Sequence, residues 1–300
     1  MGVEFHCHTV FSIDGYGTPE ELVEAAAARG VSALSITEHN HLGSAARAAA
    51  RAAQLGIRYF PGVELDAFYG ENSYHFLGFG IDPGHAGLRD LAGRNHNCYT
   101  LRFEALYAQL LALGFPWGRH ELVDHLKARY PGHPAPVLNT YLLSHFIAQK
   151  GAQDGYARMR EEALKRMAAG YEAAGPGAPG RFCRFEEARD AVHAAGGLVL
   201  LAHVGKHLPG RHEEQAALIS EMAGAGMDGF ELYHPFNTGN CRLDQLAELG
   251  RKLGCVISGG SDCHRAPGAP PNEIGRSGAP DELTAGLVAA LEARPVSGPG

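Results

Sequence analysis

The sequence has no run of about 18 apolar residues, so it lacks a segment able to cross a membrane as a helix. It opens with MGVEFHCHTV, which has no basic stretch before an apolar one, and we expect no secretory signal. Its 6 cysteines include no CxxC pair, which excludes a disulfide scaffold and favours reduced thiols in the cytoplasm. Cations are outnumbered, 26 against 33 acidic residues, and this balance argues against an extended nucleic-acid surface.

The composition indicates a globular protein that is unusually rich in histidine. The 300 residues are 45% hydrophobic and 20% charged, enough to build a substantial core. Histidine occurs 17 times, and histidine is the commonest protein ligand for metals. We therefore examined where these histidines fall relative to the predicted elements.

The first 65 residues or so alternate between short apolar runs and helical patterns. Strands are predicted over Val3–Cys7, Ala33–Thr37 and Arg58–Val63, and helices over Pro19–Arg29 and Gly43–Leu55. Strands separated by helices are typical of a parallel sheet with helices packed outside. Tyr74–Ile81 reads as a further strand that could pair with the end of the third.

The middle of the chain is helical in pattern. Apolar residues recur at spacings of three and four in four segments: Leu91–Leu113, Arg119–Arg129, Val137–Gln149 and Asp154–Ala174. The aromatic side chains Tyr99, Phe115 and Trp117 fit either the core of these helices or a platform for a base. The Gly/Pro run at residues 175–180 has neither helical nor strand character and reads as a linker.

After the linker the strand–helix alternation resumes. The predicted segments are Phe185–Ala195, Leu198–Ala202, Glu213–Ala225, Gly229–Tyr233, Arg242–Leu253, Cys255–Ser258 and Asp281–Ala293. We expect an α/β protein in which residues 1–85 and 181–294 form one discontinuous barrel-like domain. Residues 86–174 would be a helical insertion or cap, and residues 295–300 a frayed tail.

Metal-binding side chains stand where the predicted strands end. Nine of them share this position: His6, His8, Asp14, His39, Glu64, His75, His203, Asp262 and His264. Alternate side chains of a strand share a face, so His6 and His8 point one way and Cys7 the other. The C-terminal strand ends of an α/β barrel converge on one rim. Nine groups there are too many for one ion and predict two or three.

Each of these residues also has an ordinary interpretation when taken alone. The histidines of HCH could be solvated, Asp262 could cap a turn, His75 could be a barrel histidine, and Glu64 could pair with an arginine. Unrelated roles for these residues would not place titratable groups at the C-terminal end of nearly every predicted strand. Their common position therefore predicts a metal site.

The motifs HCHT, TEHN, PGVEL, HFLGF, LAHV and GGSDCH, in this order, resemble the PHP family of phosphoesterases, named for polymerase and histidinol phosphatase. The resemblance covers residues 3–275, with the helical insertion matched only loosely. It implies a distorted (β/α)7 barrel that holds two or three divalent ions, typically manganese, zinc or iron. Each motif then supplies one or two of the predicted ligands.

The resemblance implies a ligand set for each ion. His6, His8, Glu64 and Asp262 would hold one metal. Glu64 would bridge to a second ion, which His75 and His203 also hold, and the third ion would take Asp14, His39 and His264. Two departures stand out: the aspartate commonly comes one residue sooner, where this chain has Ile13, and Val204 replaces a common proline. Asp14 is therefore the weakest of the predicted ligands.

The predicted reaction is hydrolysis of a phosphate monoester by a hydroxide that bridges two ions, without a serine or cysteine nucleophile. His234, at the end of a strand, is the candidate general acid, although it could be a surface histidine before proline. Lys206 is the candidate phosphate contact, because other members of the family carry a cation there, although it could be a solvated loop lysine. Cys7 is interpreted as a core residue.

The sequence GFELYH and the helical insertion are most similar to the branch of the family that acts on nucleotides. We expect a small phosphorylated substrate, a nucleotide or a short RNA. Histidinol phosphate or another small phosphate ester is the alternative. A catalytically silent metal-binding module and an amidohydrolase are alternatives from other classes, the last disfavoured because Glu64 takes the place of a bridging carboxylated lysine. The oligomeric state stays open.

Overall fold

The computed structural model describes residues 2–134, 136–150, 154–175, 178–264, 274–275 and 279–294. The chain forms two compact units. One consists of residues 1–92 and 183–300, and the other of residues 93–182. The predicted tail at 295–300 lies outside the described residues.

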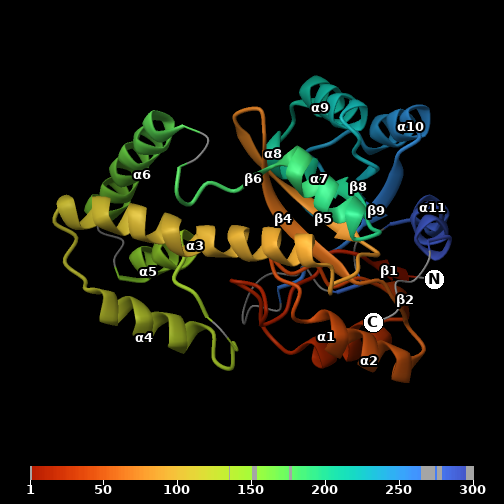
Figure 1. The fold of residues 1–300 in the computed structure, drawn as a ribbon, viewed down its shortest axis with the longest axis horizontal. Helices are drawn as coiled ribbons and strands as arrows, with labels where there is room; N and C mark the ends of the chain where they lie inside the picture. Colours follow the sequence, from red (N-terminus) through yellow and green to blue (C-terminus); the bar gives the residue numbers. More distant parts are fainter. Residues whose placement is uncertain are drawn as a thin grey trace. The chain divides into compact units, whose positions relative to one another are not determined.

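The strands of the first unit form two sheets within its described residues (Figure 1). The smaller sheet has the order β1–β2–β3, formed by Gly2–Glu4, Val31–Leu34 and Arg58–Tyr59. The larger sheet has the order β6–β4–β5–β7–β8–β9, formed by Cys183–Arg184, Gly62–Tyr69, Asn72–Phe79, Leu198–Leu201, Gly229–Tyr233 and Val256–Gly259.

One strand runs against its neighbours. β5 is antiparallel to both β4 and β7, whereas the remaining pairs are parallel. The β4–β5 hairpin turns through Gly70, whose φ of 59° suits glycine, and Glu71. The pairing of the Tyr74–Ile81 segment with the strand before it is therefore confirmed, and that pair departs from an all-parallel arrangement.

The mixed α/β class is confirmed, but the two regular sheets do not confirm a seven-stranded barrel. Two isolated parallel bridges join the segments that follow strands of the smaller sheet to the larger sheet: Cys7, after β1, pairs with Cys263, after β9, and His39, after β2, pairs with Glu64 in β4. β1 stops at Glu4, whose carboxylate accepts the backbone N–H of His6 at 3.2 Å. A side-chain acceptor thus takes the place of a ladder partner just before the predicted site.

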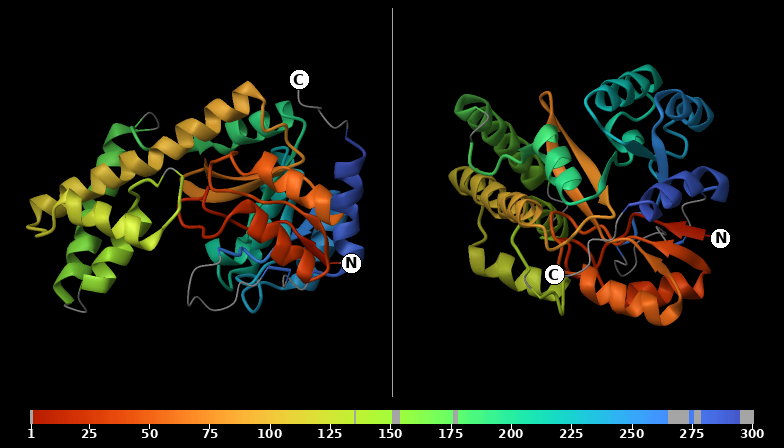
Figure 2. Two further views of the ribbon diagram at one scale, coloured as in Figure 1. Left: turned by 90° about the horizontal axis from the view of Figure 1, so that it is seen from below. Right: turned by 45° about the vertical axis from the view of Figure 1, so that its right-hand side comes forward.

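Helices cover the outer sides of these sheets (Figures 1 and 2). They are α1 (Pro19–Ala28), α2 (Ala45–Leu55), α7 (Phe185–Ala194), α8 (Val204–His207), α9 (His212–Gly224), α10 (Leu243–Leu253) and α11 (Asp281–Glu292). Thr18 and Glu21 form a capping box that fixes where α1 begins. α1 and α2 pack on the smaller sheet, α7 on β4 and β7, and α11 on β9. The core lies between these helices and the strands.

The second unit is helical. It contains α4 (Arg119–Arg129), α5 (Thr140–Lys150), α6 (Asp154–Ala174) and most of α3 (Ala86–Ala112). Tyr99 and Phe115 are buried, and the Trp117 ring lies 4.8 Å from that of Tyr156 and 5.5 Å from that of Phe146. Tyr99 and Phe115 therefore belong to the core, whereas Trp117 is only half-buried and its role stays open.

Most predicted elements lie where the sequence places them, and α4, α6 and β8 match to the residue. The third strand differs, because the chain breaks between Tyr59 and Gly62 into β3 and β4. Pro61 has no N–H with which to continue a ladder. Residues 176–177 of the predicted linker lie outside the described residues, and the predicted domain bounds stay a prediction. No helix among the described residues is long and apolar enough to cross a membrane.

Candidate metal centre

The predicted ligands come from segments that follow the strands or lie in β4 and β5. His6 and His8 follow β1, His39 follows β2, and Asp262 and His264 follow β9. The turn after β9 approaches the first segment closely at Gly260, where a Cβ would lie 2.2 Å from the Cβ of His6. Only glycine permits this approach, which brings two motifs more than 250 residues apart into contact.

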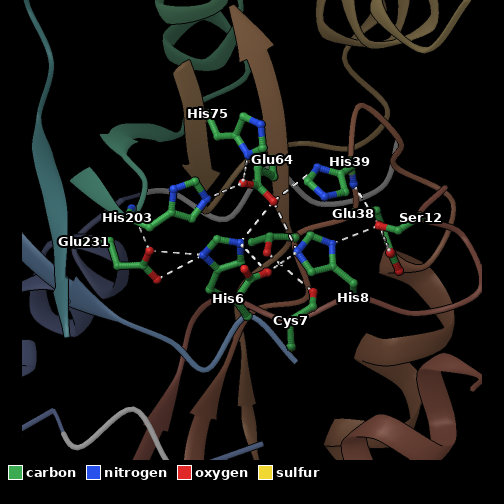
Figure 3. Close-up of polar contacts among 12 residues, drawn as sticks. His6, Cys7, His8, Ser12, Glu38, His39, Glu64, His75, His203 and Glu231 are labelled. Carbon is green, nitrogen blue, oxygen red and sulfur yellow. Dashed lines mark hydrogen bonds and ion pairs between the residues drawn. The ribbon is translucent and has the colours of Figure 1, made fainter. Parts of the chain in front are cut away.

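Glu64 lies at the centre of the cluster (Figure 3). Its carboxylate is 1% exposed, and its two oxygens face different imidazoles. Oε2 lies 3.0 Å from His6 Nε2, 3.2 Å from His8 Nε2 and 3.3 Å from His39 Nδ1. Oε1 lies 2.7 Å from His75 Nδ1 and 3.2 Å from His203 Nε2. One carboxylate thus contacts five histidines.

A tight quartet surrounds Oε2. His6, His8, Glu64 and Asp262 each offer a ligand atom within 4.8 Å of the others, and all four are buried. Asp262 Oδ1 lies 3.4 Å from His6 Nε2 and 3.2 Å from His8 Nε2. These are the same four residues to which the resemblance assigns one metal.

The two histidines of this quartet each bind a further side chain through Nδ1, and this bond places a ring proton on that nitrogen. His6 Nδ1 lies 3.0 Å from Glu231 Oε1, which can only accept, so Nδ1 carries the proton. His8 Nδ1 donates to Ser12 Oγ at 2.9 Å, since that hydroxyl donates its own proton to Glu38 at 2.7 Å. In both rings Nε2 is therefore the nitrogen that faces Glu64 and Asp262.

A second group lies beside the quartet. His264 Nδ1 donates to the carbonyl oxygen of Asp262 at 2.8 Å, and its Nε2 lies 3.3 Å from Asp14 Oδ1. His39 Nε2 is 3.8 Å from the same oxygen of Asp14. The rings of His8 and His264 stack with centroids 4.2 Å apart. Asp14 therefore lies between the two histidines with which it was predicted to act.

On the other side of Glu64, its oxygen Oε1 faces His75 and His203. The other ring nitrogen of His75 lies 3.3 Å from Asp66 Oδ1, so this imidazole is held between two carboxylates. The structure also groups His39 with Glu64 and His75 as a possible ligand set. His39 thus lies within reach of two of the predicted ions.

Strained backbone marks the same place. The non-glycine residues with positive φ among those the structure describes are Asn40 (49°), His203 (24°) and Asp262 (53°). Such conformations cost on the order of 1–3 kcal/mol each and persist where surrounding contacts hold them. Two of the three are predicted ligands, and Asn40 follows a third.

The charges in the site are strongly coupled. Burial alone would raise the pKa of Glu64, but the imidazoles of His6, His39 and His75 hold it well below its ordinary value. Burial disfavours a charged His6, yet Glu231, Glu64 and Asp262 raise its pKa well above the usual range. Burial likewise opposes charge on His75 and His264, whose carboxylate neighbours raise the pKa of each to about 10. The site therefore has a strong field that favours positive charge.

The side chains fit a divalent cation. Among the residues that the structure describes, four buried ligand atoms have no hydrogen-bond partner: His8 Nε2, Asp14 Oδ1, His39 Nδ1 and His264 Nε2. Buried imidazole nitrogens and carboxylate oxygens that converge in this way are stabilised by positive charge between them, from protons or from a bound cation. Imidazole nitrogens with carboxylate oxygens are the donor set that Zn, Fe and Mn accept.

The candidate general acid and the candidate phosphate contact differ in exposure to solvent. His234 is 1% exposed, and its Nδ1 accepts the N–H of Phe236 at 3.0 Å, which leaves the ring proton on Nε2. That Nε2 lies 3.5 Å from Asp262 Oδ2. His234 is therefore no surface histidine. Lys206 is exposed on α8, with its Nζ 5.4 Å from the centre of the Phe236 ring.

The sequence reasoning missed the residues that hold the ligands. They are buried, and four of them are bound to a predicted ligand or its backbone: Glu4, Ser12, Asp66 and Glu231. The fifth, Glu38, accepts the hydroxyl proton of Ser12. A signal existed for two of them. Asp66 is two residues from Glu64 on one strand and so shares its face, and Glu231 is a lone carboxylate inside the apolar strand β8.

Comparison with known proteins identifies the family. The model of the PHP domain matches residues 4–223, more than half of the chain. The chain belongs to the PHP family. The resemblance seen in the motifs is thus confirmed, and the prediction of a phosphoester hydrolase agrees with the relatives that follow.

Individual PHP proteins match over nearly the whole chain. The 3′,5′-nucleoside bisphosphate phosphatase of Chromobacterium violaceum is 30% identical over 287 residues, covering 92% of this chain and 91% of that protein. The 5′-3′ exoribonuclease Rnm of Salmonella typhimurium is 29% identical, covering 91% and 88%. A Bifidobacterium adolescentis structure described as a metal-dependent phosphoesterase aligns with a TM-score of 0.70 at 24% identity, covering 96% of each chain, which supports the fold.

Proposed function

We propose that this PHP protein removes a phosphate group from a nucleotide or short oligonucleotide, using two or three divalent ions held by the nine predicted ligands. The observation that carries the proposal is the position of Glu64, whose two oxygens face two separate groups of imidazoles. A carboxylate in this position supports an ion on each side. The third group, Asp14, His39 and His264, would take the remaining ion.

The chain's own residues have distinct parts in the proposed reaction. Divalent ions, when bound, supply an acidified water and neutralise phosphate charge. His6, His8 and Asp262 form one wall of the site, and the hydrogen bonds of Nδ1 with Glu231 and Ser12 keep the Nε2 atoms of both histidines turned into it.

Two further side chains would act on the substrate. His234 holds its ring proton at Nε2 beside Asp262, so it can donate this proton to a leaving oxygen. Lys206 adds an exposed cation for a phosphate oxygen. Neither role requires either side chain to bind an ion.

The nucleotide substrate is supported by the relatives rather than by the site itself. The two curated relatives above are named for a nucleoside bisphosphate and for RNA, and both match about nine-tenths of this chain. The identity of the ions is not fixed by a mixed histidine and carboxylate donor set, which accepts manganese, zinc and iron.

A panel of phosphate esters tests the proposal. It contains a 3′,5′-bisphosphate nucleotide, a nucleoside monophosphate, a 5′-phosphorylated trinucleotide and histidinol phosphate, each with added Mn²⁺ and measured by release of phosphate or mononucleotide. We expect kcat/KM to be highest for one of the first three. A preference for histidinol phosphate would select the alternative substrate, and no turnover of any ester at full metal occupancy would favour the silent binding module.

A further inference from the structure

Glu231 is a buried carboxylate that none of the predicted roles uses. It lies in the middle of β8, between Phe230 and Leu232, which are fully buried in the hydrophobic core. Burying a carboxylate in an apolar strand is costly unless strong donors satisfy it. The partners of Glu231 therefore indicate what the residue does.

Those partners belong to two different ligands. His6 Nδ1 lies 3.0 Å from Oε1 and 3.2 Å from Oε2, and the backbone N–H of His203 donates to Oε2 at 3.0 Å. Figure 3 shows Glu231 reaching both residues from the side opposite Glu64. His6 belongs to the quartet around Glu64 Oε2, whereas His203 faces Glu64 Oε1.

Each contact controls a property that a metal ligand needs. The bond to His6 holds a proton on Nδ1, makes the imidazole more basic and turns Nε2 toward Glu64 and Asp262. The bond to His203 holds a backbone whose φ of 24° is unfavourable for a residue with a Cβ. Losing the carboxylate would release both constraints together.

We propose that Glu231 is a positioning residue that couples the first two ion sites by fixing the His6 ring and the His203 backbone at once. This inference rests on the proposed function, because it requires ions on both sides of Glu64. It predicts that one substitution at a residue outside the nine predicted ligands weakens both sites. The expected loss of Mn²⁺ affinity is about 10–100-fold at each.

The test uses the whole chain, freed of metal by chelation and titrated with Mn²⁺ by calorimetry. Glu231→Gln keeps the size of the side chain, but its single amide oxygen can replace only one of the two carboxylate oxygens that bind His6 and His203. Glu231→Asp keeps the charge but moves the carboxylate away from both partners, because the side chain is one methylene shorter. Asp228→Asn is the matched control, because the Asp228 carboxylate also binds one imidazole and one backbone N–H, those of His193 and Val199, neither of which belongs to a predicted ligand.

We expect Glu231→Gln to weaken both Mn²⁺ sites and to change the visible spectrum of the Co²⁺-loaded protein, whereas Asp228→Asn lowers the melting temperature with affinity within about threefold of wild type. Wild-type affinity and an unchanged Co²⁺ spectrum in folded Glu231→Gln, or in Glu231→Asp if the first variant does not fold, would overturn the proposal. Wild-type protein that binds no Mn²⁺ would instead refute the proposed function.

A measurement on the wild type covers the case in which neither variant folds. In the Zn²⁺-loaded, ¹⁵N-labelled protein, the His6 Nδ1 proton should give a downfield resonance that exchanges slowly, because the carboxylate of Glu231 holds it in a buried hydrogen bond. Absence of that proton signal would overturn the proposal, since His6 Nδ1 would then not be held by Glu231.

Discussion

Replacing Glu64 with glutamine should remove more function than any other single change in the site. The amide has nearly the volume of the carboxylate, so packing is retained. What changes is charge and donor pattern: one of two anionic oxygens becomes an NH₂ group directed at imidazole nitrogens. Five of these nitrogens lie between 2.7 and 3.3 Å from the present oxygens.

The size of the effect follows from how many ions share this residue. Loss of a side chain that merely supports a ligand costs about 10–100-fold in metal affinity. Direct loss of a shared anionic ligand should cost at least this at each of two ions, or about 1.4–2.8 kcal/mol per ion. Because both ions then fall in occupancy, we expect kcat to drop by on the order of 10³-fold or more.

The assay combines p-nitrophenyl phosphate turnover at saturating Mn²⁺ with metal content by mass spectrometry. Glu64→Asp retains the charge and should keep part of the metal, while Asp228→Asn controls for loss of a carboxylate that binds an imidazole outside the predicted ligand set. Normal turnover and full metal content in Glu64→Gln would refute the bridging role and the reasoning from the five contacts.

Three further predictions concern other parts of the chain. Lys206→Ala should raise KM for phosphate monoesters about tenfold with little change in kcat, and an unchanged KM would remove Lys206 from the site. His234→Gln should lower kcat about 10²–10⁴-fold for alkyl phosphates but far less for p-nitrophenyl phosphate, whose leaving group needs no proton; equal losses for both would exclude a general acid. In the helical unit, burial lowers the pKa of His125 and His145 below 6.5, so protonation favours the unfolded state. Stability should therefore be complete above pH 6.5 and fall as the pH drops below it, and His145→Gln should flatten this dependence in thermal unfolding between pH 5 and 7.5; identical pH profiles would contradict the assignment.

Local signals were sufficient to predict most elements, because their ends carry strong markers. Thr18 and Pro19 define the start of α1, and Gly56 ends α2 in the left-handed conformation. The pairing of strands is less accessible from sequence. Isolated bridges such as Cys7 to Cys263 join segments that lie beyond the ends of the regular strands, and no periodic pattern in the sequence predicts them.

The candidate site likewise contains residues that the sequence predicts and residues that it does not. Its imidazoles and carboxylates were visible because they recur at strand ends, and the alternation that turns Cys7 away from His6 and His8 agrees with the burial of Cys7 in a core cluster. Glu231 was missed because its meaning depends on His6, 225 positions away in sequence. A lone charge inside an apolar strand is the only local sign that such a residue leaves.

Metal dependence tests the central claim most directly. The whole protein should be treated with a chelator, assayed with p-nitrophenyl phosphate, and assayed again after Mn²⁺ is restored, with bound metal counted at each stage. The account predicts at least two ions per chain before treatment, no turnover without them and full recovery with them. Turnover that persists in metal-free protein would contradict it.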